Sequence, residues 1–322
     1  MRIVIYGAGA IGGVLGARLF AAGHDVVLIA RGQHGRAMAD HGLRVESPDE
    51  QVTLRIPVVD HPAAHRFEPG DVVVLAMKSH DTRAAVDQLS SLAPVETPLV
   101  CAQNGVENER AALRAFAHVY ALCVMCPATY LRPGVVQAHS TPTTGILDIG
   151  RYPRGVDPVV DDLTRALEAA TFSSRPSQHI MRWKYAKLLM NLANAAEALC
   201  GPAGRDSDLA RRARSEGEAC LRAAGIDFAS EEEDRARRAD WLKLRPIDGA
   251  RRGGGSSWQS LARGVGSIET DYLNGEIVLL GRLHGVPTPV NELLQREAND
   301  AARAGRPPGS LSVDQLAARI GA

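Results

Sequence analysis

The chain has few aromatic residues, no surplus of either charge and no long apolar run, and each of these absences excludes a class of function. Its 322 residues carry 37 Lys+Arg against 37 Asp+Glu, and 4% of them are aromatic. Binding to a polyanion needs clustered surplus Lys and Arg, and binding to a single strand needs aromatic platforms for stacking. No apolar stretch approaches the ~18 residues that a membrane-spanning helix requires. We therefore expect neither a nucleic acid nor a membrane as partner.

Cysteine is also scarce, and its spacing does not resemble a disulfide framework. The five cysteines are odd in number and scattered, unlike the closely spaced pairs of disulfide-rich secreted domains. Cys123 and Cys126 form one C-x-x-C, but it lies in the apolar stretch ALCVMCPA without a second pair, which favours a core strand over a metal or redox site. We therefore expect no metal. The N-terminus lacks the three regions of a secretory signal, so we expect a cytoplasmic protein.

The first half of the chain alternates β-rich and helical runs. Strands are expected at 2–6, 25–30, 71–77, 97–103 and 118–125, with helices at 10–22, 80–92 and 106–116 and two further strands about a Pro-Asp turn within 43–59. Strands that alternate with helices predict a parallel, doubly wound sheet, and the two strand-like runs that follow predict an antiparallel extension ending near Gly150.

After about residue 178 the segments carry helical periodicity, and we expect no strand there. The charge run EEEDRARR at 231–238 is typical of a solvated helix face. The expected fold class is therefore α/β, with an N-terminal sheet domain over residues 1–175 and an all-helical domain over 176–322. The helical part could bury a homodimer interface, although no sequence feature demands one.

A G-x-G-x-x-G motif joins the first strand to the first helix. It comprises Gly7, Ala8, Gly9, Ala10, Ile11 and Gly12. In such a turn the first glycine permits the sharp bend, the second lets the backbone approach a pyrophosphate, and the third lets helix and strand pack closely. The helix N-terminus supplies N–H donors to the phosphates. Because the motif opens an alternating chain, it predicts a dinucleotide site, against the alternative of a glycine-rich turn that binds nothing.

The end of the second strand indicates which dinucleotide binds. An NAD site usually has an acid there, which accepts hydrogen bonds from the ribose hydroxyls. Asp25 stands at the beginning of this strand, and its end holds Arg31, whose guanidinium suits a 2′-phosphate. The alternative is a solvated arginine. We expect NADPH (NADP+) as the cofactor.

Two further polar residues follow strands directly. Lys78 comes after DVVVLAM and Asn104 after TPLVCAQ, at the strand ends where ligands bind in doubly wound sheets. A surface lysine that opens a helix and an ordinary Asn-Gly turn are the alternatives. Each residue is a candidate for cofactor binding, and Asn104 is also a candidate for the substrate.

A polar stripe interrupts an apolar helix in the second half. Lys187, Asn191 and Asn194 stand at positions i, i+4 and i+7 and share one helical face. Such groups need partners when buried, and the keto and carboxylate oxygens of a substrate would supply acceptors. Solvated positions on a helix between domains are the alternative. Ser257 and Glu269 are weaker candidates, because a serine can cap a helix and an acid can complement a helix N-terminus.

Together and in this order, these motifs resemble the ketopantoate reductase family (2-dehydropantoate 2-reductases). The resemblance covers almost the whole chain and comprises GAGAIG at 7–12, Arg31, Lys78 in MKSHDT, QNG at 103–105, K-x-x-x-N at 187–191, Ser257-Trp-Gln, and Glu269-x-Asp-x-x-Asn-Gly. It implies a Rossmann-type NADP-binding domain, a helical substrate domain and an active site in the cleft between them. It also implies reduction of a 2-keto acid to a 2-hydroxy acid by NADPH, with 2-dehydropantoate or a close relative as substrate.

The resemblance assigns roles to the candidate residues. Lys187 would be the general acid that protonates the developing alkoxide, and Glu269 would hold this lysine and contact the cofactor. Arg31 and Lys78 would bind the adenosine-phosphate end. Asn104, Asn191, Asn194 and Ser257 would orient the substrate or the nicotinamide.

This chain departs from the family pattern on the substrate side. The family's second asparagine falls at Ala195, beside Asn194, a later asparagine falls near Arg205, and a usual aspartate is Ser260. Reductase chemistry is therefore better supported than specificity for pantoate. Two alternatives remain: a non-catalytic NADP(H)-binding, redox-responsive module, and another dehydrogenase that acts on a hydroxy acid or a polyol phosphate.

Overall fold

The protein, described here from a computed structural model of residues 1–320, divides into two compact units. The first unit, which we call the sheet unit, comprises Met1–Trp183 together with Glu232–Arg252. The second, the helical unit, comprises Lys184–Glu231 and the chain from Gly253 onward.

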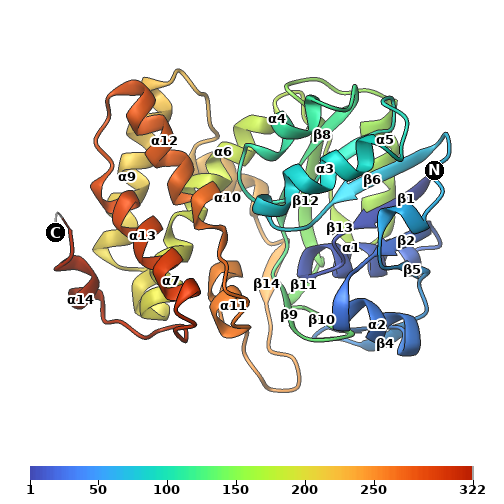
Figure 1. Ribbon diagram of the computed structural model, residues 1–322, viewed down its shortest axis with the longest axis horizontal. Coiled ribbons are helices and arrows are strands. Elements are labelled where there is room, and N and C mark those ends of the chain that lie inside the picture. Colours follow the sequence, from blue (N-terminus) through green and yellow to red (C-terminus); the bar gives the residue numbers. More distant parts are fainter. Residues whose placement is uncertain (321–322) are drawn as a thin grey trace. The chain divides into compact units, whose positions relative to one another are not determined.

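An eight-stranded sheet of order β13-β12-β8-β7-β6-β1-β2-β5 forms the centre of the sheet unit (Figure 1). Its strands are β1 (Arg2–Tyr6), β2 (Asp25–Ile29), β5 (Val58–Val59), β6 (Asp71–Leu75), β7 (Leu99–Cys101), β8 (Val119–Met125), β12 (Gly145–Arg151) and β13 (Phe172–Ser173). Neighbouring strands run parallel except β8 and β12, which pair antiparallel. The predicted alternating parallel sheet is confirmed. Of the two runs expected to form its antiparallel extension, one is β12, whereas the other, residues 135–138, belongs to a separate sheet.

Two smaller sheets and several helices complete this unit. A four-stranded sheet of order β4-β3-β10-β9 holds β3 (Leu43–Glu46), β4 (Gln51–Leu54), β9 (Ala128–Arg132) and β10 (Val135–Ala138), and a two-stranded sheet pairs β11 (Ser140–Pro142) with β14 (Leu242–Leu244). The helices are α1 (Ala10–Ala21), α2 (Gly32–His41), η1 (Pro62–Ala64), η2 (Ser79–Asp81), α3 (Thr82–Ser90), α4 (Asn108–Leu113), α5 (Pro158–Ala169) and α10 (Glu231–Arg238).

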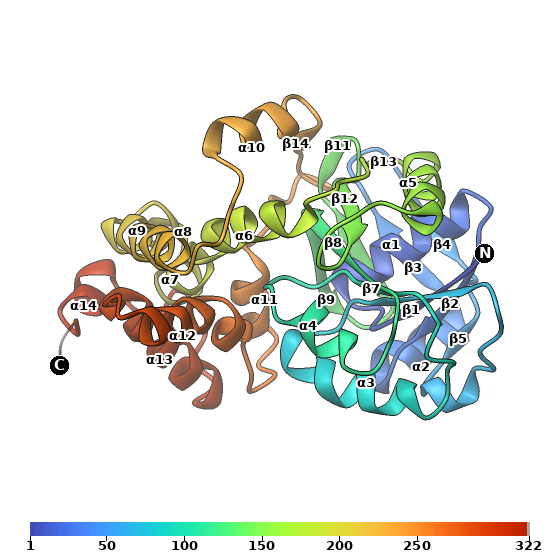
Figure 2. The ribbon, with the colours of Figure 1, turned by 90° about the horizontal axis from the view of Figure 1, so that it is seen from above.

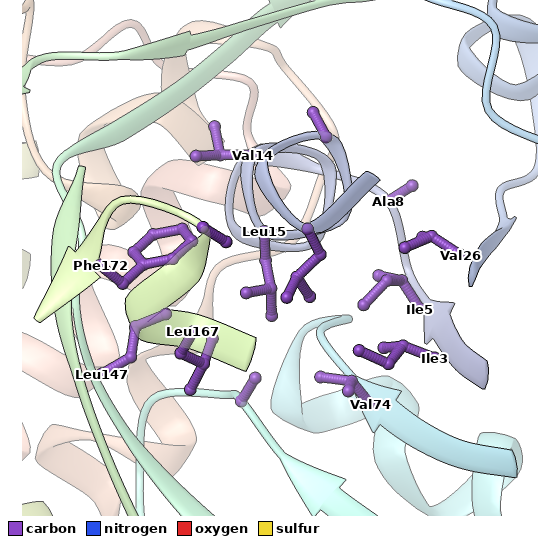
Figure 3. Close-up of a cluster of buried hydrophobic side chains, with 14 of the residues drawn as sticks. Ile3, Ile5, Ala8, Val14, Leu15, Val26, Val74, Leu147, Leu167 and Phe172 are labelled. Carbon is purple, nitrogen blue, oxygen red and sulfur yellow. The ribbon is translucent and has the colours of Figure 1, made fainter. Parts of the chain in front are cut away.

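Helices cover both faces of the main sheet because every second side chain of a strand points to the same face. Ile3 and Ile5 of β1 pack in one buried cluster with Leu15 of α1 and Leu167 of α5 (Figure 3). The alternate residues of β1 belong to a second buried cluster, which includes side chains of α3 and α4. Each fully buried leucine or isoleucine contributes about 1.5–3 kcal/mol. This two-sided burial holds the carboxyl ends of the parallel strands at one edge of the sheet.

Residues 232–252 return to the sheet unit, although they lie far along the chain. The expectation of no strand after residue 178 is wrong at β14, which pairs antiparallel with β11. The expectation of a fully solvated charge run at 231–238 is also wrong, because Asp234 and Arg237 are buried. Arg237 donates from Nε and Nη2 to both carboxylate oxygens of Asp148 in β12, at 2.7 and 2.6 Å. A three-residue strand and a long-range ion pair leave no periodic pattern in the sequence.

The helical unit consists of helices packed around α7 (Figure 2). Its elements are α6 (Ile180–Asn191), whose first residues belong to the sheet unit, α7 (Ala193–Cys200), α8 (Pro202–Arg205), α9 (Asp208–Ala223), α11 (Ser256–Ala262), η3 (Glu269–Tyr272), α12 (Asn274–His284), α13 (Pro289–Arg303) and α14 (Val313–Ala317). Among residues 1–320, none of the helices has the length and apolar character needed to cross a bilayer.

Buried amides hold the junction between α6 and α7. The carbonyl of Leu192, which separates the two helices, accepts a hydrogen bond from Asn274 Nδ2 at 3.1 Å. The same nitrogen also donates to Oδ1 of Asn291, at 3.0 Å. Neither asparagine is exposed to solvent. Because unpaired buried amides are costly, this arrangement specifies where the helix breaks.

Candidate active site

The turn between β1 and α1, residues 7–12, needs glycine at its first and last positions for packing reasons. Gly7 has φ +100°, a left-handed conformation, and a Cβ there would lie 2.6 Å from the nitrogen of Met77. A Cβ on Gly12 would lie 2.3 Å from the carbonyl oxygen of Gly7. The backbone therefore passes close to its neighbours at both ends of the turn.

The middle glycine of the turn faces open space instead. A Cβ on Gly9 would have no atom within 4 Å. Gly9 is the N-cap of α1, and no side chain caps the helix there. The first N–H groups of a helix need acceptors, and phosphate oxygens suit them. The open space and the uncapped helix end fit a bound pyrophosphate.

We expect alanine at Gly9 and at Gly12 to have different effects. Gly12→Ala forces a contact with backbone, so it should lower the stability by about 1–3 kcal/mol. Gly9→Ala has room in the protein and keeps a negative φ, so the stability should hold, while the affinity for NADPH should fall roughly tenfold or more because the methyl group fills the pyrophosphate space. Thermal unfolding and NADPH titration by fluorescence separate the two effects. Unchanged NADPH binding by Gly9→Ala would contradict a pyrophosphate position at this glycine.

His34 holds the turn in place, and the sequence provided no signal for it. The buried His34 of α2 has Nε2 at 2.8 Å from the carbonyl oxygen of Ala8. Its Nδ1 accepts a hydrogen bond from the nitrogen of Gly134 at 2.8 Å, so Nε2 carries the proton and donates to Ala8. The ring also lies against Tyr130, with centroids 4.2 Å apart. The turn is thereby tied to Gly134, which lies 100 positions after His34 in the chain.

Arg31 lies at the carboxyl edge of the sheet, as the sequence predicts, but it has an acidic neighbour. Its Nη2 lies 4.0 Å from Oδ2 of Asp81, and the two side chains are 71% and 43% exposed. Both charges act on Tyr6 at the end of β1: burial raises the pKa of this phenol, Arg31 opposes the rise and Asp81 adds to it. The end of β2 has no acidic residue, but Asp81, which follows β6, places a carboxylate near it.

Lys78 and Asn104 are held in neighbouring loops of the sheet unit. Lys78 is the N-cap of η2, after β6, and Asn104 follows β7. The carbonyl oxygen of Asn104 accepts hydrogen bonds from Ser79 Oγ at 3.1 Å and from Asn108 Nδ2 at 2.9 Å. The glycine turn, Arg31, Lys78 and Asn104 thus all lie at the carboxyl ends of parallel strands in the sheet unit.

The polar stripe of the helical unit spans the junction of two helices. Lys187 and Asn191 belong to α6 and are partly buried, whereas Asn194 belongs to α7 and is 7% exposed. The amide nitrogen Nδ2 of Asn191 is buried and has no hydrogen-bond partner among residues 1–320. Because a buried donor without an acceptor is costly, this nitrogen is suited to an oxygen of a ligand.

Glu269 and Ser257 are both buried in the helical unit. Glu269 in η3 is 3% exposed and Ser257 in α11 is 1% exposed. Only Leu273 separates the element that carries Glu269 from Asn274, which donates a hydrogen bond to the carbonyl of Leu192. The η3–α12 segment therefore adjoins the junction that follows the helix of Lys187.

A further carboxylate, which no sequence motif indicates, lies beside Asn194. Glu197 Oε2 accepts hydrogen bonds from the nitrogen of Gly255 at 3.1 Å and from Arg205 Nη1 at 3.2 Å. A Cβ on Gly255 would lie 3.5 Å from Oδ1 of Asn194. Arg205, one of the three departures, is therefore paired with an acid. The other two departures, Ala195 in α7 and Ser260 in α11, are buried. Ser260 Oγ donates a hydrogen bond to the backbone carbonyl of Ser256 in the same helix.

Sequence comparisons identify both halves of the chain with one family. The family description "Ketopantoate reductase PanE/ApbA" matches residues 3–154, and its C-terminal counterpart matches residues 179–301. A 2-dehydropantoate 2-reductase of Pyrococcus horikoshii is 28% identical over 302 residues, which cover 91% of this chain and 95% of the relative. One from Archaeoglobus fulgidus is 29% identical over 303 residues, with 91% and 95% covered.

Solved structures have the same fold over nearly the whole chain. A PanE/ApbA family ketopantoate reductase from Ralstonia eutropha JMP134 has a TM-score of 0.77 at 28% identity and covers 95% of this chain and 100% of its own. D-mandelate dehydrogenase in complex with NADH and anilino(oxo)acetate has a TM-score of 0.78 at 21% identity, with 95% and 99% covered, and shares the fold. From the matches over both halves and the shared fold, the chain belongs to the ketopantoate reductase family.

Proposed function

We propose that this protein reduces a 2-keto acid to a 2-hydroxy acid with NADPH, and that 2-dehydropantoate or a close relative is the substrate. The observation that carries the proposal is the buried amide nitrogen of Asn191, which lacks an acceptor among residues 1–320 and lies one helical turn after Lys187. A keto acid brings keto and carboxylate oxygens to such donors. The relatives named above, 2-dehydropantoate 2-reductases, support this substrate class.

The chain's own residues would supply the proton and the orientation of the substrate. NADPH, when bound, supplies the hydride that reduces the keto carbon. Lys187 donates a proton from Nζ to the keto oxygen, and its ammonium stabilises the negative charge that develops there. Glu269, a buried carboxylate, positions the lysine. Asn191, Asn194 and Ser257 donate hydrogen bonds to the substrate oxygens.

The sheet unit would hold the cofactor. The uncapped N-terminus of α1 and the open space at Gly9 accept the pyrophosphate. Lys78 and Arg31 bind the adenosine-phosphate end, and Asn104 contacts the nicotinamide end or the substrate. The family is NAD(P)H-dependent, and Arg31 is the feature that favours NADPH in this chain.

Replacing Arg31 with alanine tests the preference for NADPH. A charge-assisted hydrogen bond is worth about 1.5–3 kcal/mol, so Arg31→Ala should weaken NADPH binding roughly ten- to a hundredfold and leave NADH binding nearly unchanged. The measurement is the Kd of each cofactor by fluorescence titration. Asp81→Asn is the matched variant: it removes the negative charge beside Arg31 and should strengthen NADPH binding. If Arg31→Ala weakened the binding of NADPH and NADH equally, Arg31 would not be the residue that binds the 2′-phosphate.

The proposed activity is tested by following NADPH oxidation with a panel of 2-keto acids. The panel should contain 2-dehydropantoate, a branched aliphatic 2-keto acid, an aromatic one and one with a second carboxylate. We expect turnover with at least one member and the corresponding 2-hydroxy acid as product. NADPH binding without turnover of any member would instead favour a redox-responsive binding module.

A further inference from the structure

A connected set of hydrogen bonds joins the loop after β6 to the loop after β7. We call it the loop network, and it consists of Ser79, Thr82, Gln103, Asn104 and Asn108. Thr82 Oγ1 accepts from Gln103 Nε2 at 2.7 Å and donates to Asn108 Oδ1 at 2.7 Å. Asn108 Nδ2 then donates to Ser79 Oγ at 3.2 Å and to the carbonyl of Asn104 at 2.9 Å. Ser79 Oγ donates to that same carbonyl at 3.1 Å.

The polar side-chain groups of Ser79, Thr82 and Asn108 are buried and hydrogen-bonded within the network. Ser79, Thr82 and Asn108 are each 2% exposed, and Gln103 is 4% exposed. Asn108 uses both hydrogens of its amide group and its oxygen, and the hydroxyl of Thr82 both accepts and donates. Buried polar groups are costly unless they are bonded, so these hydrogen bonds favour one arrangement of the segments that they join. Apolar contacts alone would join the same loops with less directional control.

The two loops that the network joins carry two of the proposed cofactor residues. Lys78 immediately precedes Ser79, and the backbone carbonyl of Asn104 is the acceptor on which two of the hydrogen bonds converge. None of the chemistry proposed above uses Thr82 or Asn108 directly. Both lie at the N-termini of helices, α3 and α4, so the network also ties these helix starts to the loops.

We propose that Thr82 and Asn108 are positioning residues for NADPH binding, which act by holding Lys78 and Asn104 in their binding geometry. The proposal rests on the proposed function, because that function places the cofactor at these loops. A loop ordered before binding loses less conformational freedom when the ligand arrives. Loss of the network should therefore raise the Kd for NADPH more than it changes kcat.

The experiment compares Thr82→Val with Thr82→Ser. Valine keeps the branched shape but lacks the hydroxyl, so the Kd for NADPH should rise roughly tenfold, whereas serine keeps the hydroxyl and should stay within about twofold of the wild type. Ser79→Ala, a smaller change, should raise this Kd by about threefold or more, because one hydrogen bond to Asn104 is lost. Fluorescence titration gives Kd, and steady-state kinetics give KM and kcat.

A control variant separates positioning from general loss of stability. Tyr120→Phe also removes a buried hydroxyl from the sheet unit, the one that donates to Asp157 at 2.9 Å, but near the start of β8 and away from the carboxyl ends of the parallel strands. It should lower the melting temperature and leave the Kd for NADPH within about twofold. If Thr82→Val and Ser79→Ala lower the melting temperature but also leave this Kd unchanged, the network is merely structural and the proposal fails. If the wild type itself does not bind NADPH, the proposed function fails instead.

Discussion

Replacing Lys187 with alanine is expected to lower kcat for 2-keto acid reduction by roughly a hundredfold or more, the usual size of a general-acid effect. The variant loses the proton donor for the keto oxygen and the positive charge that stabilises the alkoxide. NADPH binding should change little, because the proposed cofactor contacts, apart from that of Glu269, lie in the sheet unit. Steady-state kinetics with the best substrate of the panel, together with NADPH titration, provide the measurement.

Two further variants of the same helix sharpen this test. Lys187→Arg keeps the positive charge but donates a proton poorly, because the pKa of a guanidinium lies well above that of an ammonium. It should therefore retain substrate binding better than Lys187→Ala while kcat stays low. Lys184→Ala is the matched control, since Lys184 is a buried lysine in the same α6. A large loss of kcat in Lys184→Ala but not in Lys187→Ala would show that Lys184, and not Lys187, is the proton donor.

Replacing Arg237 with methionine is expected to destabilise the sheet unit by about 3–5 kcal/mol, because Asp148 would remain as a buried charge without its partner. The side chains of this ion pair are 4% and 8% exposed, and Arg237 also donates to Ser173 Oγ at 3.1 Å. Urea-induced unfolding followed by circular dichroism measures the loss. The pair holds residues 232–252 against β12, so proteolysis within this segment should also accelerate.

The double variant Arg237→Met/Asp148→Leu distinguishes an unpaired charge from lost packing. Replacing both members of a buried ion pair with apolar residues of similar size is often neutral. We therefore expect the double variant to recover much of the stability that the single variant loses. A double variant as unstable as Arg237→Met would show that the ion pair is not the source of the loss, and a single variant as stable as the wild type would show that other contacts hold the segment.

Local patterns were sufficient to predict most strands of the central sheet, but not the two-residue strand β13. Each strand from β1 to β8 in the main sheet is a short apolar run, and α3 buries Thr82, Ala85, Val86 and Leu89 at helical spacing, so tertiary contacts reinforce what local preferences already favour. The glycines of the turn at residues 7–12 were predictable for the same reason, because a sharp bend followed by close packing requires residues without side chains.

The candidate site was predictable where a motif carries its own chemistry. The stripe of Lys187, Asn191 and Asn194 follows from helical spacing, although the structure breaks the helix at Leu192. The contacts that distant segments make around the site were not predictable. His34 contacts Ala8 and Gly134, and Glu197 contacts Gly255, across separations that leave no periodic trace.

The amino-acid sequence by itself determined the strands β1, β2, β6, β7 and β8, the glycine turn and the position of Arg31, because these depend on residues near one another in the chain. Only the tertiary structure decided that Asp81 approaches Arg31, that Thr82 and Asn108 join two loops, and that Arg237 brings residues 232–252 back to the sheet. The physical reason is the same in each case. A buried hydrogen bond or ion pair depends on where two distant segments meet, and that position is set by the packing of the whole unit.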